Sequence, residues 1–215
     1  MPAAERTVTI ELADVRLQGD LARPPRARAL VVFVHGSGSS RRSSRNRVVA
    51  AALQDAGFAT LLFDLLSVEE DRDYANRFDI PRLTRRLLAV TQWLREDPAL
   101  AALPLGYFGA STGAAAALDA AADLGTQVAA VVSRGGRPDL AMENLPRVRA
   151  PTLLIVGGAD YEVLQLNEQA YAALRCDKDL AIVPGATHLF EEPGALEEVA
   201  RLAGDWFRRW APVRR

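Results

Sequence analysis

The chain is poor in several residue types, and each scarcity excludes a class of protein. Its 215 residues contain one cysteine, Cys176, so no disulfide can form within the chain. One cysteine and two histidines do not show the spacing of a zinc site, and we expect no metal. Basic and acidic residues nearly cancel, leaving a net charge of −1. We therefore expect neither nucleic acid nor a membrane as a partner.

Long apolar runs are also missing. Residues 1–6 lack the apolar stretch of a signal peptide, and no run of about 18 apolar residues indicates a membrane span. We therefore expect a cytoplasmic protein. No Pro/Ser/Gly tract, charge block or repeat divides the chain, so residues 1–215 are predicted to form a single domain. We expect a monomer or a homodimer, which the sequence does not distinguish.

What the chain does contain is an alternation of strand-like and helix-like segments. Short apolar runs predict strands over residues 7–12, 15–21, 30–34, 58–63, 105–108, 128–132, 152–156 and 180–183. Apolar residues at helical spacing predict helices over residues 44–56, 80–95, 114–122, 164–174 and 195–210. The alternation indicates an α/β fold with a mostly parallel sheet of about eight strands and helices on both faces. The first two strands, which no helix separates, are predicted to form an antiparallel edge.

The motif that points to chemistry is Gly109-Ala110-Ser111-Thr112-Gly113. It reads G-x-S-x-G and stands between a predicted strand and a predicted helix, the context in which this pattern forms a nucleophile elbow. Such a turn lifts the serine oxygen above the edge of the sheet, and the glycines let strand and helix approach. A serine hydroxyl is a poor nucleophile at neutral pH and needs a base, which in turn needs an orienting partner.

His188 and Asp160 are the predicted base and its partner. Each follows a predicted strand, as Ser111 does, and open parallel sheets place their sites at the carboxyl ends of their strands. The order Ser111, Asp160, His188 is also the order in which such sheets carry hydrolytic triads. His35 is interpreted as structural. The acids that compete with Asp160 are Asp64, Asp139 and Asp177, and Asp64 is interpreted as a loop brace.

Four short segments share their pattern with one known family. They are His35-Gly36-Ser37-Gly38, the elbow motif, Gly157-Gly158-Ala159-Asp160 and Gly185-Ala186-Thr187-His188. With them the chain resembles the α/β-hydrolase superfamily, and most closely its small, cap-less dienelactone-hydrolase-like group. The resemblance implies the α/β-hydrolase fold, no cofactor, and an oxyanion hole made by the backbone N–H groups of Ser37 and Thr112. The namesake enzymes carry a cysteine nucleophile, so the serine form is more similar to the esterase members.

These features predict a serine hydrolase that cleaves small or short-chain carboxylic esters through an acyl-enzyme. The interval 133–151 is too short for a helical cap, so the site is predicted to be open. A lactone or thioester hydrolase and a non-catalytic binding protein of the same fold are the alternatives. The arginines near the predicted site either form a solvated surface or pair with a substrate carboxylate or phosphate. We predict substrate contacts by Gly36, Arg41, Arg42 and Arg134.

Overall fold

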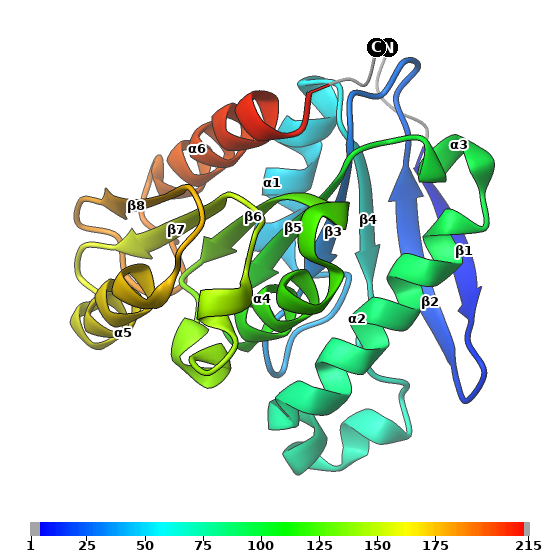
Figure 1. Cartoon of the computed structure of the whole chain (residues 1–215), viewed down its shortest axis with the longest axis horizontal. Coiled ribbons are helices and arrows are strands. Elements are labelled where there is room, and N and C mark those ends of the chain that lie inside the picture. Colours follow the sequence, from blue (N-terminus) through cyan, green and yellow to red (C-terminus); the bar gives the residue numbers. More distant parts are fainter. Residues whose placement is uncertain (1–4, 213–215) are drawn as a thin grey trace.

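The computed structural model describes residues 5–212, and Figure 1 shows one twisted sheet with helices on both of its faces. In this part of the chain the sheet has eight strands in the order β1-β2-β4-β3-β5-β6-β7-β8. β1 pairs with β2, and β2 with β4, in antiparallel fashion. The neighbouring strands in the rest of the sheet, β4-β3-β5-β6-β7-β8, are parallel to one another. The predicted sheet with an antiparallel edge is therefore confirmed.

The elements lie close to their predicted positions. The strands are β1 (Glu5–Glu11), β2 (Arg16–Ala22), β3 (Leu30–Val34), β4 (Ala59–Phe63), β5 (Leu105–Ala110), β6 (Val128–Arg134), β7 (Thr152–Gly157) and β8 (Lys178–Val183). The α-helices are α1 (Ser44–Asp55), α2 (Ile80–Arg95), α3 (Pro98–Ala101), α4 (Thr112–Leu124), α5 (Tyr161–Ala173) and α6 (Ala195–Trp210). None of the helices in residues 5–212 combines the length and the apolarity that crossing a bilayer requires.

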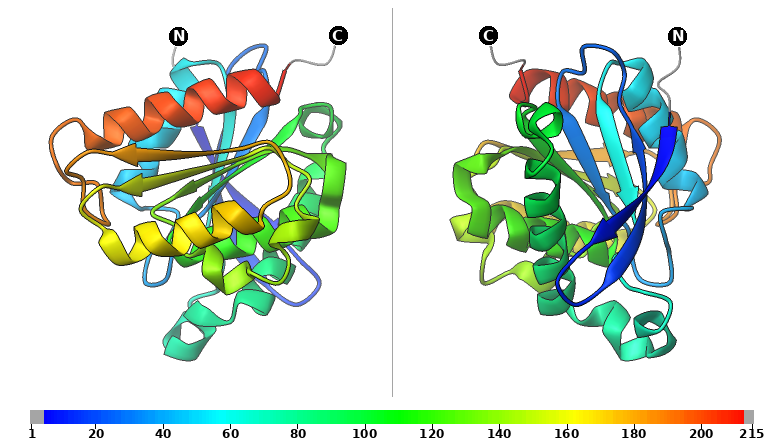
Figure 2. Two further views of the ribbon diagram at one scale, coloured as in Figure 1. Left: turned by 60° about the vertical axis from the view of Figure 1, so that its left-hand side comes forward. Right: turned by 90° about the vertical axis from the view of Figure 1, so that its right-hand side faces the viewer.

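Two apolar layers sandwich the sheet. Figure 2 shows α1 and α6 on one face, and α2, α4 and α5 on the other. β3 contributes to both layers, because successive side chains of a strand point to opposite faces. Val31 packs with the α1 and α6 side and Val32 with the α2 and α4 side. This two-sided burial explains why the central strands read as continuous apolar runs.

Several elements differ from the sequence prediction. β6 continues two residues further, so Ser133 and Arg134 are strand residues rather than the start of a loop. α5 begins at Tyr161, three residues earlier than predicted. The short helix α3 was not predicted, although Asp97 caps it and Pro98 begins it. The polar stretch 67–79 is not a plain loop, because it contains two 3₁₀ helices, η1 (Glu70–Arg72) and η2 (Tyr74–Phe78).

The interval between β6 and β7 leaves the carboxyl edge of the sheet uncapped. It holds the 3₁₀ helices η4 (Pro138–Ala141) and η5 (Leu145–Arg147). Both are shorter than two helical turns, and in residues 5–212 no cap domain covers this edge. The side chains that follow β3, β5, β7 and β8 therefore meet at one open rim.

Candidate active site

Ser111 occupies a strained turn between β5 and α4. It is the single residue between the two elements, with φ 51° and ψ −124°. A non-glycine residue in such a conformation costs about 1–3 kcal/mol and persists only where the surroundings hold it. Two backbone hydrogen bonds do so here: Ser111 N donates to the Arg134 carbonyl (3.3 Å), and Arg137 N donates to the Ser111 carbonyl (3.0 Å). The predicted strand–turn–helix geometry is present, and the role of Ser111 as a nucleophile stays a prediction.

The glycine after the elbow is required by close packing. A Cβ on Gly113 would lie 2.2 Å from the carbonyl oxygen of Val34, at the end of β3. Only glycine permits α4 to begin this close to the neighbouring strand. The loop after β3 is equally near, since a Cβ on Gly36 would lie 2.9 Å from Cβ of Ser111. The loop after β3 therefore lies directly beside Ser111.

Asp160 and His188 are joined by a hydrogen bond. His188 Nδ1 lies 2.7 Å from Oδ2 of Asp160, and the two side chains are 38% and 15% exposed. Asp160 occupies the N-cap position of α5, where an aspartate normally accepts from the helix backbone. Its side chain makes no such cap. The carboxylate binds the imidazole instead, which fixes the ring and leaves Nε2 without a hydrogen bond in residues 5–212.

Ser111 and His188 lie on either side of one turn. The backbone carbonyl of Arg134 accepts a hydrogen bond from the Ser111 N–H. A Cβ on the next residue, Gly135, would lie 3.6 Å from Nδ1 of His188. In residues 5–212 the imidazole is hydrogen-bonded to Asp160 and not to the Ser111 hydroxyl. Such contacts are often long in unliganded enzymes and tighten when substrate binds. The structure therefore joins the acid and the base, and in residues 5–212 the Ser111 hydroxyl makes no hydrogen bond to the imidazole.

The two backbone N–H groups predicted to form the oxyanion hole differ in whether they already have an acceptor. Thr112 begins α4, where the first backbone N–H groups have no intrahelical acceptor and the helix dipole favours negative charge. Ser37 N already donates to Oγ1 of Thr112 (2.8 Å). This bond was not foreseen, because nothing in the sequence signals that the residue after the serine binds the loop after β3. The Ser37 N–H has to leave or share this acceptor before it can bind an oxyanion.

His35 braces the loop after β3. Its Nδ1 lies 2.9 Å from the Gly36 carbonyl, and its Nε2 accepts from the backbone N–H of Leu65 (3.0 Å). A carbonyl can only accept, so the proton of the neutral ring is on Nδ1. Burial lowers the pKa of His35, which keeps the ring neutral. Both nitrogens are used by backbone groups, in agreement with a structural role.

Two of the three competing acids, Asp64 and Asp139, bind arginines through their carboxylates. Asp64 accepts from the backbone N–H of Arg41 (2.8 Å) and from its Nη1 (2.5 Å). Asp139 accepts two hydrogen bonds from Arg137, at 2.9 and 2.8 Å. Asp177 offers its backbone carbonyl to Thr152 N. None of the three is hydrogen-bonded to a histidine in residues 5–212.

The predicted substrate-contacting arginines differ in their surroundings. Arg41 is largely buried and bound to Asp64 and, at 3.5 Å, to Asp20, so its charge has partners within the protein. Arg42 is exposed. Arg134 is 6% exposed, and its Nη2 donates to Asn46 Oδ1 (3.0 Å). Of these three arginines, Arg42 alone is exposed and has no ion pair in residues 5–212, so both interpretations stay open for it.

Arg134 supports the His188 loop. Its guanidinium lies 5.7 Å from the ring centroid of Phe190, a buried residue two positions after His188 with φ 56°. Burial lowers the pKa of Arg134 to about 10, and the nearby charge of Arg45 acts in the same direction. This role was not predicted from the sequence. The one available signal was the Gly135-Gly136 pair, which marks a close approach of backbones after β6.

Comparison with known proteins places the chain among hydrolases. A model of the dienelactone hydrolase family matches residues 17–210. The crystal structure of a dienelactone hydrolase from Anabaena variabilis is 52% identical, with a TM-score of 0.95, and the match covers 98% of this chain and all of that one. Est1E from Butyrivibrio proteoclasticus shares the fold at 16% identity, with a TM-score of 0.82 over 95% of this chain and 98% of its own.

A longer relative has a different name. A Mycobacterium tuberculosis protein, provisionally named a phosphoribosyl transferase, is 60% identical over 206 residues. These residues are 96% of this chain but 46% of the relative, so the chain spans about half the length of that protein.

Proposed function

Since the chain belongs to the dienelactone hydrolase family, we propose that it is a serine hydrolase for small or short-chain carboxylic esters, with Ser111, Asp160 and His188 as its triad. The observation that carries the proposal is the hydrogen bond between Asp160 and His188. It diverts the carboxylate from the helix it would ordinarily cap, beside a serine held in a strained turn. Strain of this kind is concentrated at functional sites.

In the proposed reaction His188 acts first as a base. Ser111 Oγ attacks the ester carbonyl while Nε2 of His188 takes its proton, and Asp160 stabilises the imidazolium. The N–H of Thr112 and the N–H of Ser37 bind the oxyanion, the second after release from Oγ1 of Thr112. His188 then protonates the leaving alcohol. A water molecule activated by His188 hydrolyses the acyl-enzyme and restores Ser111.

A small hollow beside the oxyanion loop supports the preference for short acyl groups. It measures about 10 Å³ and is lined by residues 35–39, by Leu65, Leu66 and Leu83, and by the ion-paired Asp71 and Arg77. That volume accommodates about one water-sized group. The open rim above the triad leaves the size of the alcohol portion less restricted. Of the arginines, exposed Arg42 is the one that the proposal retains as a contact for an anionic substrate.

The name of the M. tuberculosis relative is not part of the proposal. The match covers less than half of that protein, and over this chain it coincides with the region that the dienelactone hydrolase model describes. Phosphoribosyl transfer is therefore not assigned to these residues. Lactones and thioesters stay as alternatives, because the same triad serves them.

Turnover of p-nitrophenyl acetate tests the proposal. We expect the wild type to hydrolyse it and Ser111→Ala to lose about 10⁶-fold in kcat, as expected when the nucleophile of a triad is removed. Ser44→Ala, at an exposed serine that begins α1, is the matched control and should keep full activity. A panel with a thioester and a lactone identifies the preferred bond. A wild-type protein that cleaves none of them would instead be a binding protein, and the proposal would be wrong.

A further inference from the structure

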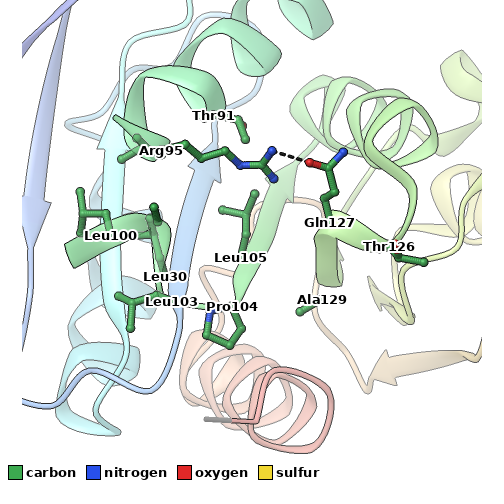
Figure 3. Close-up of a pocket in the computed structure, with 12 residues that line it drawn as sticks. Leu30, Thr91, Arg95, Leu100, Leu103, Pro104, Leu105, Thr126, Gln127 and Ala129 are labelled. Atoms are coloured by element: carbon green, nitrogen blue, oxygen red, sulfur yellow. Dashed lines mark hydrogen bonds between the residues drawn. The ribbon is translucent and has the colours of Figure 1, made fainter. Parts of the chain in front are cut away.

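A second cavity lies at the opposite edge of the sheet from the triad. It measures about 330 Å³ and is formed where α2 ends, α3 follows and β5 begins (Figure 3). Leu105 is in its wall and lies at the start of β5, six positions before Ser111. At about 3.3 Å per residue this is a separation of about 20 Å. The cavity is therefore not part of the candidate active site.

The lining is apolar on one side and polar on the other. Its volume falls within the usual range of small-molecule sites, about 300–1,000 Å³. Arg95 is the one charged residue among those that line it, and no carboxylate is present. The apolar lining residues are Leu30, Leu94, Leu100, Ala101, Leu103, Pro104, Leu105 and Ala129, and the neutral polar ones are Thr91, Thr126 and Gln127.

Arg95 is hydrogen-bonded inside the cavity to a neutral residue. Figure 3 shows its guanidinium reaching across the cavity, where Nη1 donates to Oε1 of Gln127 (2.5 Å). Gln127 is neutral, and Arg95 has no ion pair in residues 5–212. Two arginines on the same helix behave differently, since Arg82 and Arg86 both pair with Glu70, at 3.6 and 2.7 Å. A guanidinium with donors to spare beside an apolar wall suits a ligand with an anionic head and an apolar tail.

We propose that this cavity binds a small aliphatic monocarboxylate. The carboxylate accepts from the guanidinium of Arg95, and the hydrocarbon chain lies along the leucines at the start of β5 and around α3. The hydroxyl of Thr91 lies 2.6 Å from that of buried Tyr107 and is hydrogen-bonded to it. Thr91 therefore has fewer hydrogen bonds to offer a ligand. The positive charge that recognises the head group comes from Arg95.

Calorimetric titration with hexanoate tests this assignment without using catalysis. We expect Arg95→Gln to weaken binding at least tenfold, because the charge-assisted hydrogen bond to the carboxylate is lost. Arg85→Gln makes the same charge change at an exposed position of α2 and should bind hexanoate as the wild type does. Hexan-1-ol should bind the wild type and Arg95→Gln equally weakly. Melting temperatures show whether each variant is folded.

A carboxylic acid could also bind at the triad, as a product of ester hydrolysis. The position of the bound ligand distinguishes the two sites. Crystals soaked with 6-bromohexanoate should give an anomalous bromine peak among the leucines of the cavity. Ala101→Trp, at an exposed lining position, should block the mouth and abolish the peak while Arg95 is retained. Equal affinity of the wild type and Arg95→Gln, no binding by the wild type, or bromine only at the triad would each overturn the proposal. None of these results depends on whether the protein is an esterase.

Discussion

The loops that carry the two histidines differ in one respect that decides their roles. Both follow parallel strands at the same edge of the sheet. The ring of His35 has both nitrogens bound to backbone groups, at Gly36 and Leu65. The ring of His188 has one nitrogen bound to a carboxylate, and in residues 5–212 no further hydrogen bond occupies the other. A histidine is available as a base only where the structure leaves a nitrogen unused.

The order of the strands explains the difference. β3 lies in the interior of the sheet between β4 and β5, so the chain leaving it is surrounded by neighbouring backbone. β8 is the edge strand, and the chain after it has room to present a side chain. Position at the carboxyl edge is therefore not sufficient to identify a catalytic histidine. Its neighbours in the sheet decide whether it is enclosed or accessible.

The largest expected effect comes from removing each histidine in turn and measuring ester turnover. We expect His188→Ala to lower kcat about 10⁶-fold, because the base of a triad is lost. His35→Gln acts only through the loop that carries Ser37. Its loss should not exceed the about 10²–10³-fold that removal of one oxyanion donor costs. Circular dichroism checks that both variants are folded, and equal losses in the two variants would break the comparison.

Much of this arrangement could be predicted from sequence. Residues 30–34, 80–95 and 195–210 coincide with β3, α2 and α6, because a continuous apolar run and a long helical period are strong local signals. The contact of Asp160 with His188 followed from their loops and their order along the chain. The catalytic role of the pair stays a prediction.

Contacts between distant polar residues could not be predicted. Arg41 lies between Asp64 and Asp20, and Arg134 lies over Phe190, although nothing local distinguishes these residues from solvated ones. The extension of β6 was missed for a related reason. Arg134 looked like a loop residue, but at the end of this strand its side chain is buried. Pairings of this kind depend on the folded register and not on local propensity.

The second prediction compares the histidines by the pH dependence of stability. Burial lowers the pKa of His35 in the folded protein below its ordinary value of about 6.5. Between these two values the unfolded chain binds more protons, so the free energy of unfolding decreases as the pH falls below about 6.5. We expect the melting temperature of the wild type to fall more between pH 7.5 and pH 5 than that of His35→Gln.

His188 is present in both proteins of that experiment, so its contribution cancels. At pH 7.5 the variant should be less stable by about 1–3 kcal/mol, because the Leu65 N–H and the Gly36 carbonyl lose their partner. For a chain of this size each kcal/mol lowers the melting temperature by about 2–4 °C. If the two melting curves shift in parallel with pH, His35 is not the buried neutral group described above.

The smallest expected effect concerns Thr112, whose hydroxyl connects the loop after His35 to the elbow. Thr112→Val removes the acceptor that engages Ser37 N and should raise kcat for p-nitrophenyl acetate about threefold. This corresponds to the net contribution of one neutral hydrogen bond, about 0.5–1.5 kcal/mol. Thr112→Ser keeps the hydroxyl and should match the wild type. A decrease in Thr112→Val would mean that the bond positions the oxyanion loop rather than restraining it.

Labelling with a fluorophosphonate tests the central claim most directly, because only a serine with an active base reacts with it. After digestion, mass spectrometry should find the adduct on Ser111 in the wild type and in His35→Gln, and no adduct in His188→Ala. A wild-type protein that does not react, an adduct on another residue, or labelling of His188→Ala at the wild-type rate would contradict the account.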